Sequence, residues 1–228
     1  VRKSNLINRL TEVRNNNREI TVNSLLNYSA TFGEDHGLKI LGGYSQIEHD
    51  NSSLSAYRQG FYNNDLQSIG QGTNDATKDN SGGDFEWGLR SFFGRVNYSF
   101  KDKYLFEANA RYDGSSRFTG DNRYSFFPSF SVGWRLSEEA FWSGLEETVS
   151  DFKLRASWGE TGNQAVPLYS YFSTLDLVTY SLNGATVPGY VQRQLSDPNL
   201  HWETTTQTDI GLDAEFLNGI DGGRQPVH

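Results

Sequence analysis

Apolar and polar side chains alternate one by one along much of the chain, and residues 92–112 show this most clearly. Val96 and Tyr98 fall on one face together with phenylalanine and glycine. Arg95 and Asn97 fall on the other face, and the alternation resumes after a three-residue connection. Because successive side chains of a strand point to opposite faces, the pattern predicts a β-hairpin with one apolar and one polar face.

Similar alternation recurs along the chain and predicts about seven strands in all. It is less regular before residue 50, where a hairpin is expected around Gly33–Gly37, and regular again in the second half. A further turn is expected near Asn218 and Gly219. The predicted strands are residues 20–32, 38–48, 92–100, 104–112, 126–136, 152–159 and 202–216.

The two faces of these strands differ in a way that favours a membrane β-barrel. The apolar face carries aromatic residues near the strand ends, such as Tyr104 and Trp134, with small residues such as Ala108 between them. The polar face carries charges in mid-strand, including Glu107 and Arg155. Outer-membrane strands of ~9–11 residues have an apolar outside, a polar lumen and aromatic girdles at both interfaces. The predicted fold class is therefore all-β, an antiparallel transmembrane β-barrel segment.

Connection lengths give the same answer and add an orientation. Short connections at 33–37 and 101–103 alternate with longer ones at 49–90, 113–125 and 162–201. Outer-membrane barrels place short turns on the periplasmic side and long loops outside. The connection at 137–151 is longer than such a turn, and residues 138–142 within it are predicted to form a short amphipathic helix in the membrane interface, capped by Ser137.

Composition narrows the alternatives. Apolar residues make up only 36% of the 228 residues, and no run approaches the ~18–20 apolar residues that a membrane-spanning helix needs. There is no cysteine, which excludes disulfides and thiolate sites, and the net charge of -8 disfavours nucleic acid as a partner. The chain starts at Val1 without methionine or a signal peptide, so residues 1–219 are interpreted as a partial barrel and residues 220–228 as a truncated or unrelated tail.

Several segments, in this order and spacing, resemble the barrel of SusC/RagA-type TonB-dependent transporters. They are Phe93–Tyr98, Asp102–Leu105, Arg111–Phe118, Phe126–Ser129, Lys153–Gly159 with Gly162–Gln164, and Asp197–Gln207. The resemblance implies a 22-stranded outer-membrane barrel of Bacteroidota with an N-terminal plug. It also implies a SusD-like lipoprotein lid, energy from the TonB–ExbB–ExbD complex and import of oligosaccharides or peptides. The TonB box, the plug domain and the terminal strands of the family are absent from this sequence, so seven strands could not close such a barrel.

Aromatic residues in the predicted outer loops are candidate ligand-binding residues, since their rings could stack on sugars or peptides. The alternative is that they form small cores within large loops. Asp113 and Arg117 lie in a stretch that resembles the family, and Arg117 is predicted to pair with Asp113 or a neighbouring carboxylate at the extracellular rim. The loop candidates are Trp87, Tyr169, Tyr171, Tyr180 and Tyr190.

Catalytic and metal-binding residues are not predicted, and no cofactor is expected. Residues 75–86 place oxygen ligands at some positions of a calcium-binding loop, but glycine is missing at its sixth position, so a solvated surface loop is the favoured interpretation. A soluble or surface-attached all-β carbohydrate-binding or adhesion module remains the alternative function. A barrel hydrolase would need a nucleophile motif, and none is visible.

Overall fold

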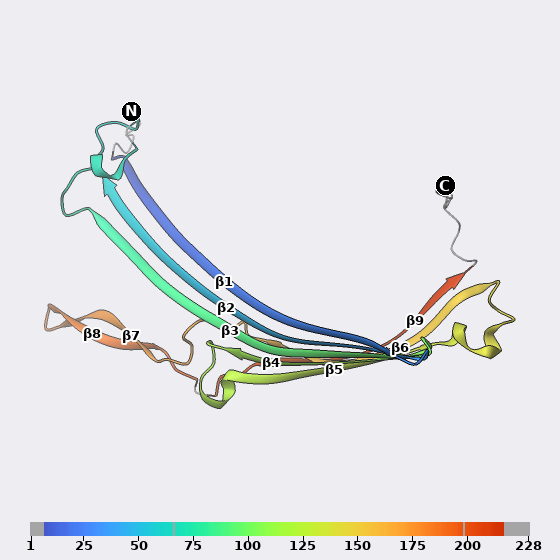
Figure 1. Ribbon diagram of the computed structural model, residues 1–228. Helices are drawn as coiled ribbons and strands as arrows, with labels where there is room; N and C mark the ends of the chain where they lie inside the picture. The colour runs from blue at the N-terminus through green and yellow to red at the C-terminus, as the bar shows by residue number, and fades with distance from the viewer. Residues whose placement is uncertain (1–6, 66, 198, 217–228) are drawn as a thin grey trace. The chain divides into compact units, whose positions relative to one another are not determined.

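The computed structural model describes residues 7–65, 67–197 and 199–216, and nine strands account for most of them (Figure 1). Seven strands form one sheet in the order β1-β2-β3-β4-β5-β6-β9, which confirms the predicted seven-stranded sheet. Strands β7 and β8 form a separate two-stranded sheet. The strands are β1 (Arg9–Phe32), β2 (His36–Gln59), β3 (Asp79–Phe100), β4 (Tyr104–Ser115), β5 (Tyr124–Arg135), β6 (Val149–Asn163), β7 (Thr174–Leu182), β8 (Ala185–Gln194) and β9 (Glu203–Phe216).

The chain divides into two compact units. Unit 1 consists of Val1–Thr21 and Ile47–Gly88, and unit 2 of Val22–Gln46 and Leu89–His228. In unit 1, Arg18 donates to Asp50 over 2.9 Å, a pairing of polar side chains on β1 and β2. The predicted loop at 49–90 is wrong at both its ends, because β2 runs to Gln59 and β3 starts at Asp79. Polar side chains on both faces hide the period of two at 49–53 and 79–84, whereas Phe85, Trp87 and Leu89 do alternate with polar residues or glycine and could have extended the predicted strand.

Unit 2 has a register that keeps like side chains together. Strands β3, β4, β5, β6 and β9 pair antiparallel in succession. Ala108 lies between Val96 and Phe130 on the apolar face, and Glu107 lies between Asn97 and Ser131 on the polar face. A shift by one residue would exchange the faces, so this alternation fixes the register.

The turn between β3 and β4 is of the kind that matches strand twist. Lys101 and Asp102 both have positive φ, 53° and 52°, and the Lys103 amide donates to the Phe100 carbonyl over 3.1 Å. Two central residues in the left-handed region define a type I′ turn, which favours a tight hairpin. The predicted hairpin at 92–112 is thus confirmed with its turn in place.

The β7–β8 hairpin lies inside the predicted long loop at 162–201, and sequence reasoning missed it. Its turn has Asn183 and Gly184 at φ 51° and 79°. An Asn-Gly pair between two β-rich runs is the strongest short hairpin signal, and it could have revealed these strands.

Residues 136–148 differ from the short amphipathic helix predicted at 138–142. They contain two short 3₁₀ turns, Leu136–Glu138 and Ala140–Trp142, in place of an α-helix. Ser137 does not cap a helix, because its hydroxyl donates to the Asp151 carboxylate over 2.7 Å. Other 3₁₀ turns are Ile69–Gln71 and Gly120–Arg123, and the turn predicted near 218–219 lies outside the described residues. Among residues 7–65, 67–197 and 199–216, no helix has the length and apolar character to cross a membrane.

Candidate functional site

The polar face of the unit 2 sheet is the first candidate site, because its side chains form a connected network. Glu107 accepts hydrogen bonds from Asn97 over 2.5 Å and from Asn109 over 2.8 Å. Arg95 donates in turn to the Asn109 amide oxygen over 2.6 Å. Two strands, β3 and β4, therefore present donors and acceptors that are already oriented by one another.

A second charged group lies across β6 and β9. The carboxylate of Asp213 accepts from Lys153 at 2.9 Å and from Arg155 at 3.5 Å. The register places Lys153 directly opposite Asp213, which explains the shorter contact. Both cations are partly exposed, so the pair can exchange partners with a charged solute at little cost.

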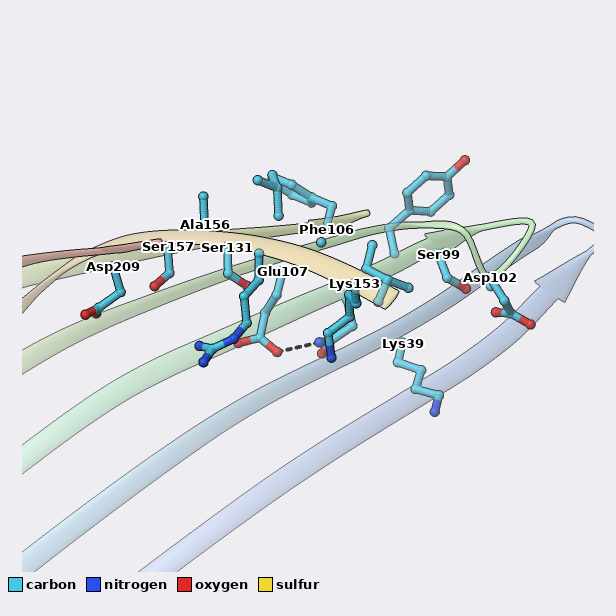
Figure 2. A pocket seen from close by; sticks show the side chains of 17 residues that line it. Lys39, Ser99, Asp102, Phe106, Glu107, Ser131, Lys153, Ala156, Ser157 and Asp209 are labelled. Carbon is cyan, nitrogen blue, oxygen red and sulfur yellow. Dashed lines mark hydrogen bonds between the residues drawn. The ribbon is translucent and has the colours of Figure 1, made fainter. Parts of the chain in front are cut away.

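A hollow of about 760 Å³ along the sheet is lined by polar side chains of this face and also by Phe106, Val132 and Ala156 of the apolar face. Figure 2 shows Lys39, Glu107, Lys153 and Ser157 projecting to one side of the sheet and Phe106 to the other. The polar lining residues are Lys39, Asn97, Ser99, Asp102, Glu107, Ser131, Lys153, Arg155, Ser157 and Asp209.

Two aromatic rings interrupt the polar face and line a neighbouring hollow of about 780 Å³. Phe93 and Phe127 both occupy positions where the alternation expects polar side chains. The Arg111 guanidinium lies 5.2 Å from the centre of the Phe93 ring, a cation–π distance. Gly43 makes room for this ring, since a Cβ there would come within 2.3 Å of Phe93. An apolar residue at a position where the alternation expects a polar one was the sequence signal that could have identified Phe93 and Phe127.

A buried aromatic cluster lies where β5 and β9 begin. We call it the rim cluster, and it consists of Phe118, Phe127 and Trp202. The ring centres lie 5.2 Å (Phe118 to Trp202) and 5.4 Å (Phe127 to Trp202) apart. The Trp202 indole N–H donates to the Arg123 carbonyl over 3.1 Å, so its polar atom is satisfied. The cluster joins the connection before β5 to the segment before β9.

Of the predicted rim residues, Asp113 lies on β4 and Arg117 directly precedes Phe118 of the rim cluster. Asp113 is buried and binds Arg111 through both carboxylate oxygens, at 3.1 and 3.2 Å. Arg117 donates to the Val166 carbonyl and so ties the 116–119 connection to the 164–173 segment. Arg111, two residues away on the same face of β4, binds the Asp113 carboxylate, and the predicted pairing of Arg117 with Asp113 or a neighbouring carboxylate stays a prediction.

The structure scatters the predicted loop aromatics. Trp87 lies on β3 of unit 1 and stacks on His49, with ring centres 5.3 Å apart, so its placement in a loop was wrong. The ring centres of Tyr171 and Phe172 lie 4.5 Å apart, and Tyr169 has a positive φ of 62°.

Tyr180 and Tyr190 occupy the β7–β8 hairpin, on its opposite faces. Tyr180 lies opposite Val187, and Tyr190 lies opposite Leu177. Positions 177 and 180 are an odd number of residues apart on one strand, so the two tyrosines point to opposite faces. Both tyrosines are exposed. The candidate aromatics therefore do not form one common surface within unit 2, and their binding of ligand stays a prediction.

Residues 75–86 do not fold as one loop. Asp75 accepts hydrogen bonds from the Thr77 hydroxyl and amide, which lower the pKa of Asp75 below its usual range. Residues 79–86 belong to β3, so the predicted solvated loop is confirmed only for 75–78. In the part of the chain that the structure describes, no group of three or more His, Cys, Asp or Glu side chains could hold a metal ion.

Comparison with known proteins finds similarity to TonB-dependent receptors. Residues 2–224 match the family described as TonB dependent receptor-like, beta-barrel. TonB-dependent receptor P26 of Formosa agariphila is 38% identical over 85% of this chain and 20% of its own length. TonB-dependent receptor SusC of Bacteroides thetaiotaomicron is 39% identical over 59% of this chain and 14% of its own length.

The similarity extends to solved structures. The RagAB peptide importer in its open-open state superposes with a TM-score of 0.83 and 25% identity, over 95% of this chain and 23% of that one. Its closed-closed state gives a TM-score of 0.77 with 26% identity. The chain thus spans about a fifth of the length of the relatives and neighbours that it matches.

Proposed function

Because the chain belongs to the family of TonB dependent receptor-like β-barrels, we propose that it forms part of the wall of an outer-membrane transporter. The transporter imports oligosaccharides or peptides, and the inner-membrane TonB–ExbB–ExbD complex supplies the energy. The chain contributes seven of the strands that close the barrel, and the remaining strands belong to other parts of the transporter.

The exposed apolar face of the unit 2 sheet carries this proposal. Val132 in the middle of β5 is 53% exposed and Ile210 on β9 is 87% exposed. A soluble protein rarely leaves such a continuous apolar surface open to water. Lipid tails would cover this apolar face and leave the polar face uncovered. The exposed apolar face therefore favours the transporter over the soluble binding module. Further exposed residues of the same face are Phe106, Phe130, Trp134, Leu154, Trp158 and Leu212.

The polar face is then the wall of the solute path, as in barrels with a polar interior. Phe93 and Arg111 offer an aromatic ring and a guanidinium beside a hydrogen-bonded network. Rings stack on sugars and apolar side chains, while guanidinium groups bind carboxylates. The wall supplies contacts that fit either class of solute.

Peptide transport has support among the solved neighbours, and oligosaccharide transport rests on the resemblance to SusC/RagA-type transporters. The solved neighbour RagAB is described as a peptide importer. The resemblance to SusC/RagA-type transporters supports a SusD-like lipoprotein as the partner on the outer side. The outer-loop aromatics Trp87, Tyr169, Tyr171, Tyr180 and Tyr190 remain proposed ligand contacts.

Uptake by intact cells tests the function. Cells that carry the transporter, cells that lack it and cells that lack TonB are compared for uptake of labelled oligosaccharides and labelled peptides. We expect one class of solute to be taken up only when both proteins are present. Equal uptake by all three strains, or recovery of the protein in the soluble fraction without detergent, would contradict the proposal.

Two substitutions test the solute path separately from assembly. Arg111→Gln and Phe93→Leu should each lower uptake several-fold while the barrel remains in the outer membrane. Tyr62→Ala is the matched control, since that side chain is almost fully exposed in unit 1. Unchanged uptake in both variants would remove Phe93 and Arg111 from the solute path.

A further inference from the structure

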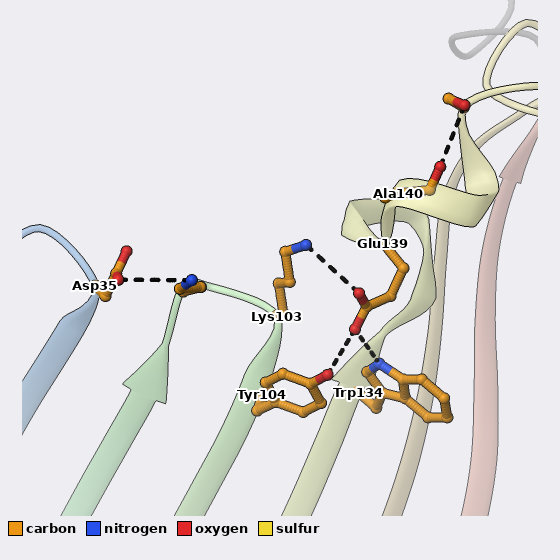
Figure 3. A network of polar contacts seen from close by, with 8 residues as sticks. Asp35, Lys103, Tyr104, Trp134, Glu139 and Ala140 are labelled. Carbon is orange, nitrogen blue, oxygen red and sulfur yellow. Dashed lines mark hydrogen bonds and ion pairs between the residues drawn. The ribbon is translucent and has the colours of Figure 1, made fainter.

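The segment at residues 136–148, which we call the interface segment, is fixed against the apolar face of the sheet. Figure 3 shows Glu139 reaching three side chains at the end of β4 and β5. Its carboxylate accepts from the Tyr104 hydroxyl over 2.7 Å and from the Trp134 indole N–H over 3.1 Å, and Lys103 lies at 3.5 Å. Tyr104 and Trp134 are register partners on the apolar face, so the segment starts on that side.

A second anchor holds the other end of the interface segment. The Trp142 ring stacks on Phe152 at 5.1 Å, and its indole N–H donates to the Val149 carbonyl over 3.1 Å. Phe152 also belongs to the apolar face, at the start of β6, where it lies opposite Ala214. Because Glu139 and Trp142 are both held in place, the side chains between and after them point in defined directions.

This fixation leaves two large apolar side chains uncovered. Phe141 is 65% exposed and Leu145 is 51% exposed. The Leu145 amide donates to the Trp142 carbonyl over 2.7 Å, and the Leu145 carbonyl accepts from Thr148 and Val149. The backbone around both residues is therefore hydrogen-bonded, and their exposure does not come from an open loop.

We propose that Phe141 and Leu145 insert into the phospholipid interface layer and anchor this end of the sheet in the membrane. The inference rests on the proposed membrane placement of the barrel. The surface is continuous with the apolar face, and tyrosine and tryptophan with polar tips mark the level where lipid meets water. Interfacial segments bind lipid in this way, with their apolar side chains buried at the boundary of the acyl chains.

A protein partner fits this surface less well. A stable protein–protein interface buries about 800 Å² on each partner. Phe141 and Leu145, beside glutamates at 138, 146 and 147, are too few for such an interface by themselves, and the apolar face that continues from them is the surface proposed to face lipid. Lipid needs no matching surface, and two apolar side chains at an interface suffice for a local anchor next to a barrel that is already inserted.

Spin labels in the full-length transporter test the anchor. The transporter is placed in nanodiscs of phosphatidylethanolamine and phosphatidylglycerol, in a background without other cysteines, with single labels at Phe141→Cys and Leu145→Cys. Accessibility to oxygen is compared with accessibility to a water-soluble nickel complex. Val132→Cys on the apolar face serves as the lipid control and Tyr62→Cys as the water control.

The expected ratio of oxygen to nickel accessibility at 141 and 145 is several-fold above that at 62 and nearer to that at 132. Nickel access at 141 and 145 equal to that at 62, with position 132 in lipid, overturns the anchor alone. Protection from both reagents also overturns it and indicates a protein cover. Nickel access at 132 instead contradicts the proposed membrane placement.

Removal of the anchor gives a second, independent measurement. The double variant Phe141→Ser/Leu145→Ser should increase the mobility of a label at Gly144, where no neighbouring atom restricts a side chain. The same variant should leave the mobility of a label at 132 unchanged, which shows that the barrel is folded. Unchanged mobility at 144 would overturn the anchor.

Discussion

The two ends of strands β4, β5 and β6 are held by opposite means. At the rim, three aromatic side chains are buried against one another and tie two long connections together. At the other end, no described side chain of the interface segment is buried, and one carboxylate binds donors from two strands and from the turn between β3 and β4. Long connections that extend into water need an apolar core of their own, whereas a segment on the apolar face can use polar ties and leave its apolar side chains outward.

The comparison predicts that the rim depends on packing. Trp202→Ala should lower the free energy of local opening of the 116–127 and 199–204 segments by about 3–5 kcal/mol, because it removes the largest ring of a closed cluster. Hydrogen exchange of the full-length transporter in nanodiscs measures this. Trp202→Phe keeps most of the ring and loses one hydrogen bond, so it should cost only about 1 kcal/mol. Equal effects of the two variants would contradict a packing role.

Gly162 provides a smaller change at the same end. A Cβ at this position would come within 2.0 Å of the Phe127 ring, so Gly162→Ala must displace a buried side chain. Overpacking of this kind costs about 1–3 kcal/mol and should speed hydrogen exchange at the rim. Gly144→Ala is the matched control in the interface segment, where a Cβ meets nothing within 4 Å. A rim unaffected by Gly162→Ala would show that Phe127 is not held in place.

Asp113→Asn is expected to have a weaker effect again. It removes the charge that Arg111 binds, but Arg111 is about half exposed, and water can replace part of the lost contact. The expected loss of local stability is about 1 kcal/mol. Arg111 should then become more mobile over the Phe93 ring. The measurement is the affinity for solute, which should change while assembly of the barrel does not. No change in either quantity would show that the pair is dispensable.

The smallest effect is expected at the interface segment, and it depends on pH. Hydrogen bonds from Tyr104 and Trp134, with the charge of Lys103, hold the pKa of Glu139 below its usual range. A lowered carboxyl pKa stabilises the fold above the ordinary value, and the contribution disappears as pH falls through the lowered value. The mobility of a label at 141 should therefore stay constant through mildly acidic pH and rise only in stronger acid. Glu139→Gln should show raised mobility that does not change with pH.

The accuracy of the strands predicted from the sequence depends on how much the two faces of each strand differ in polarity. Where one face is apolar and the other polar, as along β4 and β5, alternation located the strands to within a few residues. Where both faces are polar, as at 49–53 and 79–84, the period disappears and the pattern predicts a loop in place of strands. The rim cluster depends on Phe118 and Trp202, which are 84 positions apart by their numbers and share no local pattern.

The polar contacts were harder to predict than the strands. The role of Asp113 and Arg117 at the extracellular rim stays a prediction, and their contacts, with Arg111 and with the Val166 carbonyl, depend on which groups are close in space. Arg111 shares a strand face with Asp113, a relation that alternation does contain. Glu139 was assigned to a helix, although its donors come from the ends of two different strands.

The tight turn between β3 and β4 has a consequence for the order of assembly. Closing the connection from Phe100 to Tyr104 costs little chain entropy, whereas pairing β6 with β9 must close the stretch from Asn163 to Glu203. On the logarithmic scale of loop closure the difference is about 2 kcal/mol. The β3–β4 hairpin should therefore form early and present its open edges as templates, with β9 joining the sheet only after the rim has closed over the intervening chain.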